Sequence, residues 1–219
     1  MTMTDAPVHI VDDDKGVRES LIMLLEAEGL VARGYADAET FLAEAALTAP
    51  GVVVADVRMS GMSGLDLLRQ LQDRRVDLPL IVITGHADVA MAVQALKEGA
   101  IDFFEKPFDD GVFLASVRGG LDIGARAFRE RRRRAEIEAA AATLTPRERE
   151  VMALVAQGLP NKAAAVELSI SVRTVEIHRA HVMEKMGADS LSALVRMALE
   201  LEDQDRAARP LHDARSTHA

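Results

Sequence analysis

Side chains that can bind a cation and a phosphate group follow the apolar runs in the first half of this sequence. Asp12 and Asp13 follow the first run, Asp56 follows the third, Thr84 ends the fourth, and Lys106 stands just after the fifth. Carboxylates brought close together repel one another unless a cation lies among them. Mg²⁺ suits such a set, because it prefers oxygen ligands and bridges to the phosphates of a substrate.

The chemistry that these residue types allow is transfer of a phosphoryl group to a carboxylate. The Asp56 carboxylate is the candidate nucleophile, and its attack on phosphorus gives an aspartyl phosphate. The ammonium of Lys106 binds one phosphate oxygen, and the hydroxyl of Thr84 donates to another. Each residue alone has an ordinary explanation as a cap, a turn or a surface charge. Their order along the strand-like runs indicates a site.

Short apolar runs alternate with amphipathic stretches up to about residue 121. Five strands alternating with helices predict a parallel sheet covered on both faces, a doubly wound α/β fold. Ligand-binding groups of such a sheet gather at the carboxyl ends of the strands, where the residues above lie. The predicted strands are 8–11, 31–35, 52–55, 80–84 and 101–104, and the predicted helices are 16–28, 38–46, 64–73, 89–98 and 111–121.

Composition excludes several classes of protein. Hydrophobic residues make up 49% of the chain, which is ample for packed cores. No apolar run approaches the ~18 residues that span a bilayer. The chain has no Cys, so disulfides and thiol chemistry are excluded. The first residues lack the pattern of a signal peptide, so we expect a cytoplasmic protein with no membrane partner.

The net charge of −9 lies almost wholly in the first half of the chain. Residues 1–121 carry 10 Lys and Arg against 20 Asp and Glu, whereas residues 144–201 carry 7 against 7. This neutral C-terminal half counts mildly against DNA binding, so the argument for DNA must rest on a motif. We predict an α/β domain at 1–121, a linker helix at 122–143, a helical domain at 144–201 and a flexible tail at 202–219.

The linker is rich in helix formers and carries four consecutive arginines at 131–134. Whether it continues the last helix of the α/β domain stays open at this point. A solvated helix face is the simpler explanation of the arginines, and contact with DNA phosphates is the alternative.

From Leu144 onward the pattern is helical. Thr145 and Glu148 form a capping box around Pro146, which starts the first helix. Asn161 and Ser171 are the predicted caps of the next two helices. The third helix is predicted over 172–186, ending at Gly187, and the fourth from Ser190 through about 201.

The blocks VHIVDDD, VVVADVRMSGMSGLDLL, LIVITGH and AIDFFEKPF resemble the signature blocks of response-regulator receiver domains. The resemblance implies a flavodoxin-like, CheY-like fold with a five-stranded parallel sheet. It implies that Asp56 is the phosphoacceptor and that the receiver catalyses only its own phosphorylation and dephosphorylation, so the protein is not otherwise an enzyme.

The same resemblance implies roles for the surrounding residues. Asp12 and Asp13 hold Mg²⁺ with Asp56 and the main-chain carbonyl of Arg58. Thr84 and Lys106 bind the phosphoryl oxygens, and Phe103 is the switch aromatic residue. One departure is Ser60, where the family usually has Pro; we expect a slightly looser loop there and no loss of a catalytic group.

A second block, residues 144–199, resembles the LuxR-type DNA-binding domain, an all-α four-helix domain whose second and third helices form a helix-turn-helix. With both blocks, residues 7–200 are similar to two-component response regulators of the FixJ/NarL class. The resemblance implies a transcription regulator that is phosphorylated by a sensor histidine kinase, dimerises and binds promoter DNA.

The helix at 172–186 suits the recognition role, with its N-terminal half facing the major groove. Val175, Val182 and Met186 fall at helical spacing and are expected to pack inward. Glu176 is a candidate acceptor from cytosine and Arg179 a candidate donor to guanine. The full set of candidate DNA contacts is Lys162, Arg173, Thr174, Glu176, Ile177, Arg179, Ala180 and Lys185, each with a plain surface residue as the alternative. His178 and His181 also share a side of this helix, but without a third ligand such a pair rarely binds a metal.

The proposed switch is a population shift. The phosphoryl oxygens draw Thr84 inward, Phe103 follows, and the face formed by the fourth helix, fifth strand and fifth helix is remodelled. Val89, Val93 and Leu96 lie near that face, through which two receivers dimerise. Expected partners are the kinase, often one with a PAS domain and FixL-like, together with promoter DNA, RNA polymerase and a second copy of the chain.

Three alternatives remain. A phosphohydrolase with Asp56 as turnover nucleophile needs an acid two residues later, where Arg58 stands. A protein-interaction switch would bind RNA polymerase or another regulator through the helical domain instead of DNA. A receiver that works without phosphorylation would not need the intact pocket.

Overall fold

The computed structural model describes residues 6–86 and 89–208, with side chains described up to residue 202. The chain divides into two compact units, Met1–Glu130 and Arg131–Ala219. Most of the predicted tail, residues 209–219, lies outside the described residues, but its first residues continue a helix that ends at Ala208. Strong helix formers at the start of that segment account for the extension beyond residue 201.

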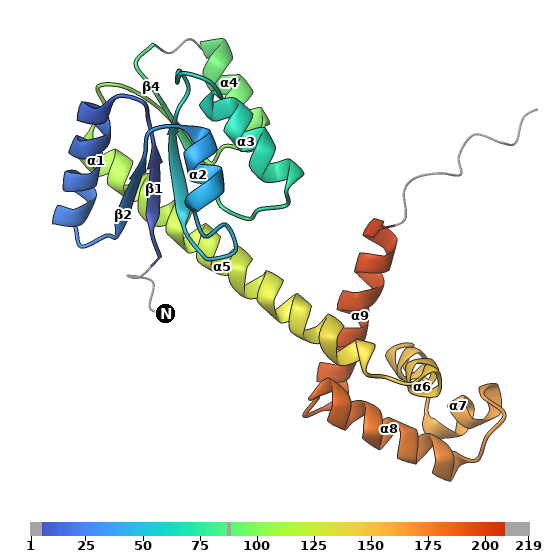
Figure 1. Ribbon diagram of the computed structural model, residues 1–219. Helices are drawn as coiled ribbons and strands as arrows, with labels where there is room; N and C mark the ends of the chain where they lie inside the picture. The colour runs from blue at the N-terminus through green and yellow to red at the C-terminus, as the bar shows by residue number, and fades with distance from the viewer. Residues whose placement is uncertain (1–5, 87–88, 209–219) are drawn as a thin grey trace, which may run out of the picture. The chain divides into compact units, whose positions relative to one another are not determined.

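The first unit is a five-stranded parallel sheet in the order β2-β1-β3-β4-β5, with helices between the strands (Figure 1). This confirms the predicted doubly wound fold. The strands are β1 Val8–Val11, β2 Ala32–Tyr35, β3 Val52–Asp56, β4 Leu80–Thr84 and β5 Asp102–Glu105, and the helices are α1 Lys15–Ala27, α2 Ala38–Glu44, α3 Gly64–Asp73, α4 Val89–Lys97 and α5 Asp110–Ala142.

Each face of the sheet carries its own apolar core, because alternate strand residues point to opposite faces. Leu25 of α1 and Phe113 of α5 pack with Ile10 on one face. Phe41 of α2 and Leu67 of α3 pack on the other face, where Ala95 of α4 completes the layer. The central strands β3 and β4 are therefore buried along their whole length, as the near-continuous apolar runs predict.

Two glycines allow helices to lie directly against the sheet backbone. A side chain at Gly64, the first residue of α3, would collide with the main-chain carbonyl of Asp56. One at Gly124 in α5 would collide with the carbonyl of Gly51. Gly64 thus fixes how closely α3 approaches the last residue of β3.

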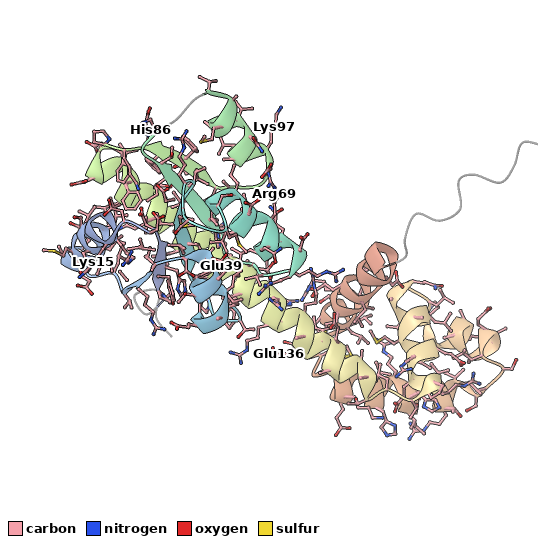
Figure 2. All side chains as sticks on the ribbon, turned by 45° about the horizontal axis from the view of Figure 1, so that its top comes forward. Lys15, Glu39, Arg69, His86, Lys97 and Glu136 are labelled. Atoms are coloured by element: carbon pink, nitrogen blue, oxygen red, sulfur yellow. The ribbon has the colours of Figure 1, made fainter. Side chains whose placement is uncertain are left out.

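The two helices α3 and α4 are also joined at the surface. Arg69 of α3 donates to the carboxylate of Glu98, the residue after α4, at 2.7 Å, and to Asp66 at 2.9 Å. Figure 2 shows Arg69 and Lys97 on these two neighbouring helices. Surface ion pairs of this kind contribute little stability.

Helix α5 is one element of 33 residues, so the linker residues continue the last helix of the α/β unit. Its residues up to Glu130 belong to the first unit, and those from Arg131 onward belong to the second. No Pro interrupts this stretch, which leaves nothing to stop the helix before Ala142.

The second unit contains α6 Pro146–Ala156, α7 Asn161–Glu167, α8 Val172–Met186 and α9 Leu191–Ala208. Its core gathers side chains from all four helices and from the end of α5: Ile137, Leu144, Val151, Met152, Val155, Ala164, Ala165, Val175, Val182, Met186, Leu194 and Ala198. The inward positions predicted for α8 are confirmed.

The predicted helix ends of the second unit are confirmed at four places and wrong at one. Ser190 caps α9, because its hydroxyl accepts from the N–H of Ala193 at 3.2 Å. Thr145 and Glu148 form the capping box, Ser171 caps α8, and Gly187 ends that helix with a left-handed backbone. Asn161 is not a cap. Pro160 holds the N-cap position of α7 without a side-chain hydrogen bond, because the Asn161 amide oxygen accepts from Arg179 at 3.0 Å instead.

Among the described residues, no helix is long and apolar enough to cross a membrane.

A buried histidine makes the stability of the first unit dependent on pH. His9 in β1 is 2% exposed, its ring packs edge-on against Phe41, and its Nδ1 lies 3.2 Å from the hydroxyl of Tyr35. Burial, helped by the charge of Arg33, lowers the pKa of His9 from 6.5 to about 4. Between these two pH values the unfolded chain binds a proton that the folded chain does not.

We therefore expect the free energy of unfolding to fall by about 3 kcal/mol from this group as pH drops from 6.5 to 4. Urea unfolding can be followed by the fluorescence of Tyr35, the single tyrosine of the chain. The difference between the native protein and His9→Gln should change by this amount across the window, while other titrating groups cancel. Parallel pH profiles of the two proteins would contradict the assignment.

Candidate functional site

The chemically active residues converge at the carboxyl edge of the sheet. Asp12 follows β1, Asp56 ends β3, Thr84 ends β4 and Lys106 follows β5. Parallel pairing of β1 with β3, of β3 with β4 and of β4 with β5 brings these four strand ends to one edge. The sequence-based placement of the site is therefore matched by the topology.

Lys106 joins two of the carboxylates. Its Nζ lies 2.7 Å from Oδ2 of Asp12 and 2.8 Å from Oδ1 of Asp56. Asp12 is 1% exposed and Asp56 is 6% exposed, so all three groups interact with little screening by water.

Main-chain donors hold the remaining carboxylate oxygens. Oδ2 of Asp56 accepts from the N–H of Arg58 at 2.7 Å, and Oδ1 of Asp12 accepts from the N–H of Asp14 at 2.9 Å. The guanidinium of Arg18 donates to the main-chain carbonyl of Asp12 at 2.6 Å. The two buried carboxylates are therefore fixed in orientation before any ligand arrives.

Asp13 differs from its neighbour because it is exposed. Its Oδ2 accepts from the main-chain N–H of Ser60 at 2.8 Å. Proline at this position has no N–H to donate. Ser60 was expected to loosen the loop after β3, yet it supplies a hydrogen bond that ties the loop to Asp13.

Thr84 and Phe103 lie behind the carboxylates. Thr84 is fully buried, and its hydroxyl is within 3.3 Å of both the main-chain N–H and the carbonyl of His86. Phe103 of β5 is partly buried against the core shared with α2, α3 and α4. The structure thus places Thr84 at the edge but bonds its hydroxyl to the segment after β4.

The charged side chains of the pocket carry a net negative charge. Burial raises the pKa of Asp12, and the hydrogen bond and charge of Lys106 counter only part of that rise. Burial also lowers the pKa of Lys106, but the hydrogen bonds and charges of Asp12 and Asp56 outweigh it and leave the pKa above its usual value. Two buried carboxylates share one ammonium, and the exposed Asp13 follows Asp12 in the chain, so the oxygen donors suit a further divalent cation such as Mg²⁺.

In the second unit, α8 exposes one side toward solvent. Arg173, Glu176, Ile177 and Ala180 are exposed, as expected of residues that face a groove. Arg173 lies 3.6 Å from Glu176 in a surface ion pair. Lys162 is exposed on α7, the first helix of the predicted helix-turn-helix.

The other candidate contacts have partners within the domain. The guanidinium of Arg179 donates to Asn161 of α7, and the hydroxyl of Thr174 lies 2.8 Å from that of Ser171. Lys185 lies near the far end of α8, where its Nζ is 2.7 Å from Oε2 of Glu148. Lys185 is therefore engaged in an ion pair between α6 and α8.

Glu148 is the charged residue of the second unit whose surroundings the sequence did not predict. It is only 3% exposed, and the hydrogen bond from Lys185, followed by that from the main chain of Thr145, lowers the pKa of its carboxyl to about 2. The capping box predicted its hydrogen bond to Thr145 but not its burial. That burial depends on how α8 packs on α6, which no local pattern records.

Comparison with known protein families gives matches to both units. Residues 8–118 match the response regulator receiver domain, and residues 142–198 match the luxR family of bacterial regulatory proteins. Receiver domains generally bind Mg²⁺ at the phosphorylation site, which agrees with the donor set described above.

Two curated relatives match nearly the whole chain. The transcriptional regulatory protein FixJ of Rhizobium meliloti is 50% identical over 197 residues, which cover 90% of this chain and 97% of that protein. FixJ of Azorhizobium caulinodans is 49% identical over 193 residues, which cover 88% and 92%.

Solved structures give the same result. The response regulator StyR superposes with a TM-score of 0.80 at 38% identity, covering 90% of this chain and 99% of that one. Full-length FixJ from B. japonicum gives a TM-score of 0.54 at 40% identity, covering 91% and 98%.

A receiver fold and a LuxR-type DNA-binding domain therefore occur in one chain, in the same order and at nearly the same length as in these relatives. The chain belongs to the FixJ-like response regulators, two-component transcription regulators that act with a kinase partner and DNA and are not metabolic enzymes.

Proposed function

We propose that Asp56 is the phosphoacceptor and that Mg²⁺ is held by Asp12, Asp13, Asp56 and the main-chain carbonyl of Arg58. The observation that carries this proposal is the bridge from Lys106 to both Asp12 and Asp56. A half-buried ammonium between two carboxylates at the carboxyl edge of a parallel sheet can bind phosphoryl oxygens.

The phosphoryl donor is a phosphohistidine of the kinase. One carboxylate oxygen of Asp56 attacks phosphorus as the bond from phosphorus to the donor nitrogen breaks, and the leaving imidazole takes up a proton from water. Bound Mg²⁺ supplies charge neutralisation for the transferring group. The N–H of Arg58 keeps the carboxylate oriented, and Lys106 exchanges an Asp56 oxygen for a phosphoryl oxygen.

The switch begins at Thr84. To donate to a phosphoryl oxygen, the buried hydroxyl of Thr84 must leave the main chain of His86, to which it is bonded. That exchange moves the segment after β4, and Phe103 follows into the space behind Thr84.

The remodelled surface is the dimer interface of this proposal. Val89, Val93 and Leu96 of α4 are 82%, 44% and 50% exposed in the present state. Apolar side chains so exposed on one helix favour burial against a second copy of the chain. Two DNA-binding domains in one dimer compensate for the neutral charge of each.

On DNA, α8 lies in the major groove. Its solvent-facing residues Glu176, Ile177 and Ala180 meet the base edges, with Arg179 beside them, while Lys162, Arg173 and Thr174 contact phosphates. Lys185 contacts a phosphate from the end of the helix, for which its ammonium must leave or share its ion pair with Glu148. A FixL-like kinase with a PAS domain, RNA polymerase at the promoter and a cytoplasmic location complete the proposal.

Asp56→Asn should remove phosphorylation. With acetyl phosphate and Mg²⁺, label incorporation should fall to background, because the amide is no nucleophile for phosphorus. Sedimentation should show no phosphodonor-dependent dimer. The matched control is Asp73→Asn, the same change at the exposed end of α3, which should label and dimerise like the native chain. Equal labelling of the two variants would refute the role of Asp56.

Lys162→Ala should weaken DNA binding, because it removes a positive charge that contacts a DNA phosphate. The slope of log affinity against log salt should become shallower by about one unit, and the loss should be similar on any DNA sequence. The control is Arg74→Ala, an exposed cation of the first unit just after α3, which should leave the slope unchanged. Equal slopes for the native chain and Lys162→Ala would remove this residue from the interface.

A further inference from the structure

A second cluster of ligand-type side chains lies in the DNA-binding unit, apart from the phosphorylation pocket. Glu148, His178 and His181 each offer one ligand atom, and these atoms lie within 4.8 Å of one another. The histidines sit three residues apart on α8, whereas Glu148 is the third residue of α6. The packing of α6 on α8 supplies the third ligand that the sequence around the two histidines lacks.

The two oxygens of Glu148 have different partners. Oε2 accepts from Lys185 at 2.7 Å and from the N–H of Thr145 at 2.8 Å. Oε1 faces Nδ1 of His181 at 3.7 Å, which is longer than a hydrogen bond. Oε1 thus belongs to a carboxylate that is fixed in place by its other oxygen.

One ring nitrogen of His178, Nδ1, is buried without a hydrogen-bond partner among the described residues. Buried polar atoms are nearly always paired, because leaving one unpaired costs about 1–3 kcal/mol. His178 also offers one ring nitrogen within 4.8 Å of the Glu148 carboxylate and of a nitrogen of His181, an arrangement that a metal ion would satisfy.

We propose that Glu148, His178 and His181 form a binding site for a divalent transition metal ion of the zinc class. Two imidazole nitrogens and one carboxylate oxygen suit Zn²⁺, and three protein ligands leave a fourth position for water. Ligand atoms around tetrahedral Zn²⁺ stand about 3.3 Å apart, given bonds of roughly 2.0–2.1 Å. Half-exposed His181, at 53% side-chain exposure, can rotate to close that gap.

The site would tie the recognition helix to α6. Lys185 already joins the two helices through Oε2, so the ion would add a second tie through Oε1 on the same carboxylate. The ammonium of Lys185 also repels a bound cation, which limits affinity. The chain therefore offers one variant expected to weaken metal binding and another expected to strengthen it.

The test is a calorimetric titration of the full-length protein with Zn²⁺, with Mg²⁺ in excess to fill the acidic pocket of the receiver. We expect one site, and His181→Gln should weaken its affinity on the order of tenfold or more, since even partners of metal ligands are worth 10-fold to 100-fold. His86→Gln removes an exposed histidine of the receiver and should leave the affinity unchanged.

Lys185→Gln removes the neighbouring positive charge and should tighten Zn²⁺ binding on the order of tenfold. Imidazole NMR signals identify the ligands directly: those of His178 and His181 should shift on addition of Zn²⁺, and that of buried His9 should not. Absence of binding would overturn the proposal. So would binding that His181→Gln leaves unchanged, or that leaves both α8 imidazole signals in place, because the ion would then lie elsewhere.

Discussion

The receiver depends on one buried electrostatic arrangement, the ammonium of Lys106 between the carboxylates of Asp12 and Asp56. Burying a charge without a partner is costly, so each of the three groups is tolerated only because the others are present. Their positions come from three different strands, and the parallel order β1-β3-β4-β5 is what brings those strand ends to one edge. Gly64 adds a constraint of the same kind, since only a residue without a side chain lets α3 pack against the carbonyl of Asp56.

The DNA-binding unit also contains a buried carboxylate paired with an ammonium, but in a one-to-one ion pair. Glu148 is as deeply buried as the receiver carboxylates, but it faces one ammonium and also accepts from the main chain of Thr145. Oε2 of Glu148 is therefore engaged in a balanced ion pair that joins α6 to α8, and Oε1 is the oxygen left for the proposed metal ion. In the receiver one ammonium faces the two carboxylates of Asp12 and Asp56, and the excess negative charge suits a cation.

The sequence predicted what depends on local patterns. Apolar runs located the five strands, and the residues that end them located Asp12, Asp56, Thr84 and Lys106, because parallel strands share an edge. Contacts between distant segments were not predictable. Asn161 has the side chain of a cap, but tertiary contact with Arg179 takes its oxygen. The capping box of Glu148 was predictable from the sequence, but its burial was not. Lys185 was predicted to be a surface cation, whereas it forms an ion pair with Glu148 of α6. Helix α5 runs on through the predicted linker to Ala142, since no Pro interrupts it.

The loop after β3 also affects how fast the aspartyl phosphate of the proposed function would be hydrolysed. Rapid hydrolysis of an aspartyl phosphate needs an acid or base held beside the phosphorus. Two residues after Asp56 the chain carries Arg58, whose side chain is exposed and whose N–H is engaged by the Asp56 carboxylate. The neighbouring acid Asp13 is tied through Oδ2 to the N–H of Ser60. Lys106, whose half-buried side chain contacts Asp56, is a cation with a raised pKa and cannot accept a proton from water. If Asp56 carries the phosphoryl group as proposed, these three side chains leave the attacking water without a general base, and slow hydrolysis is expected.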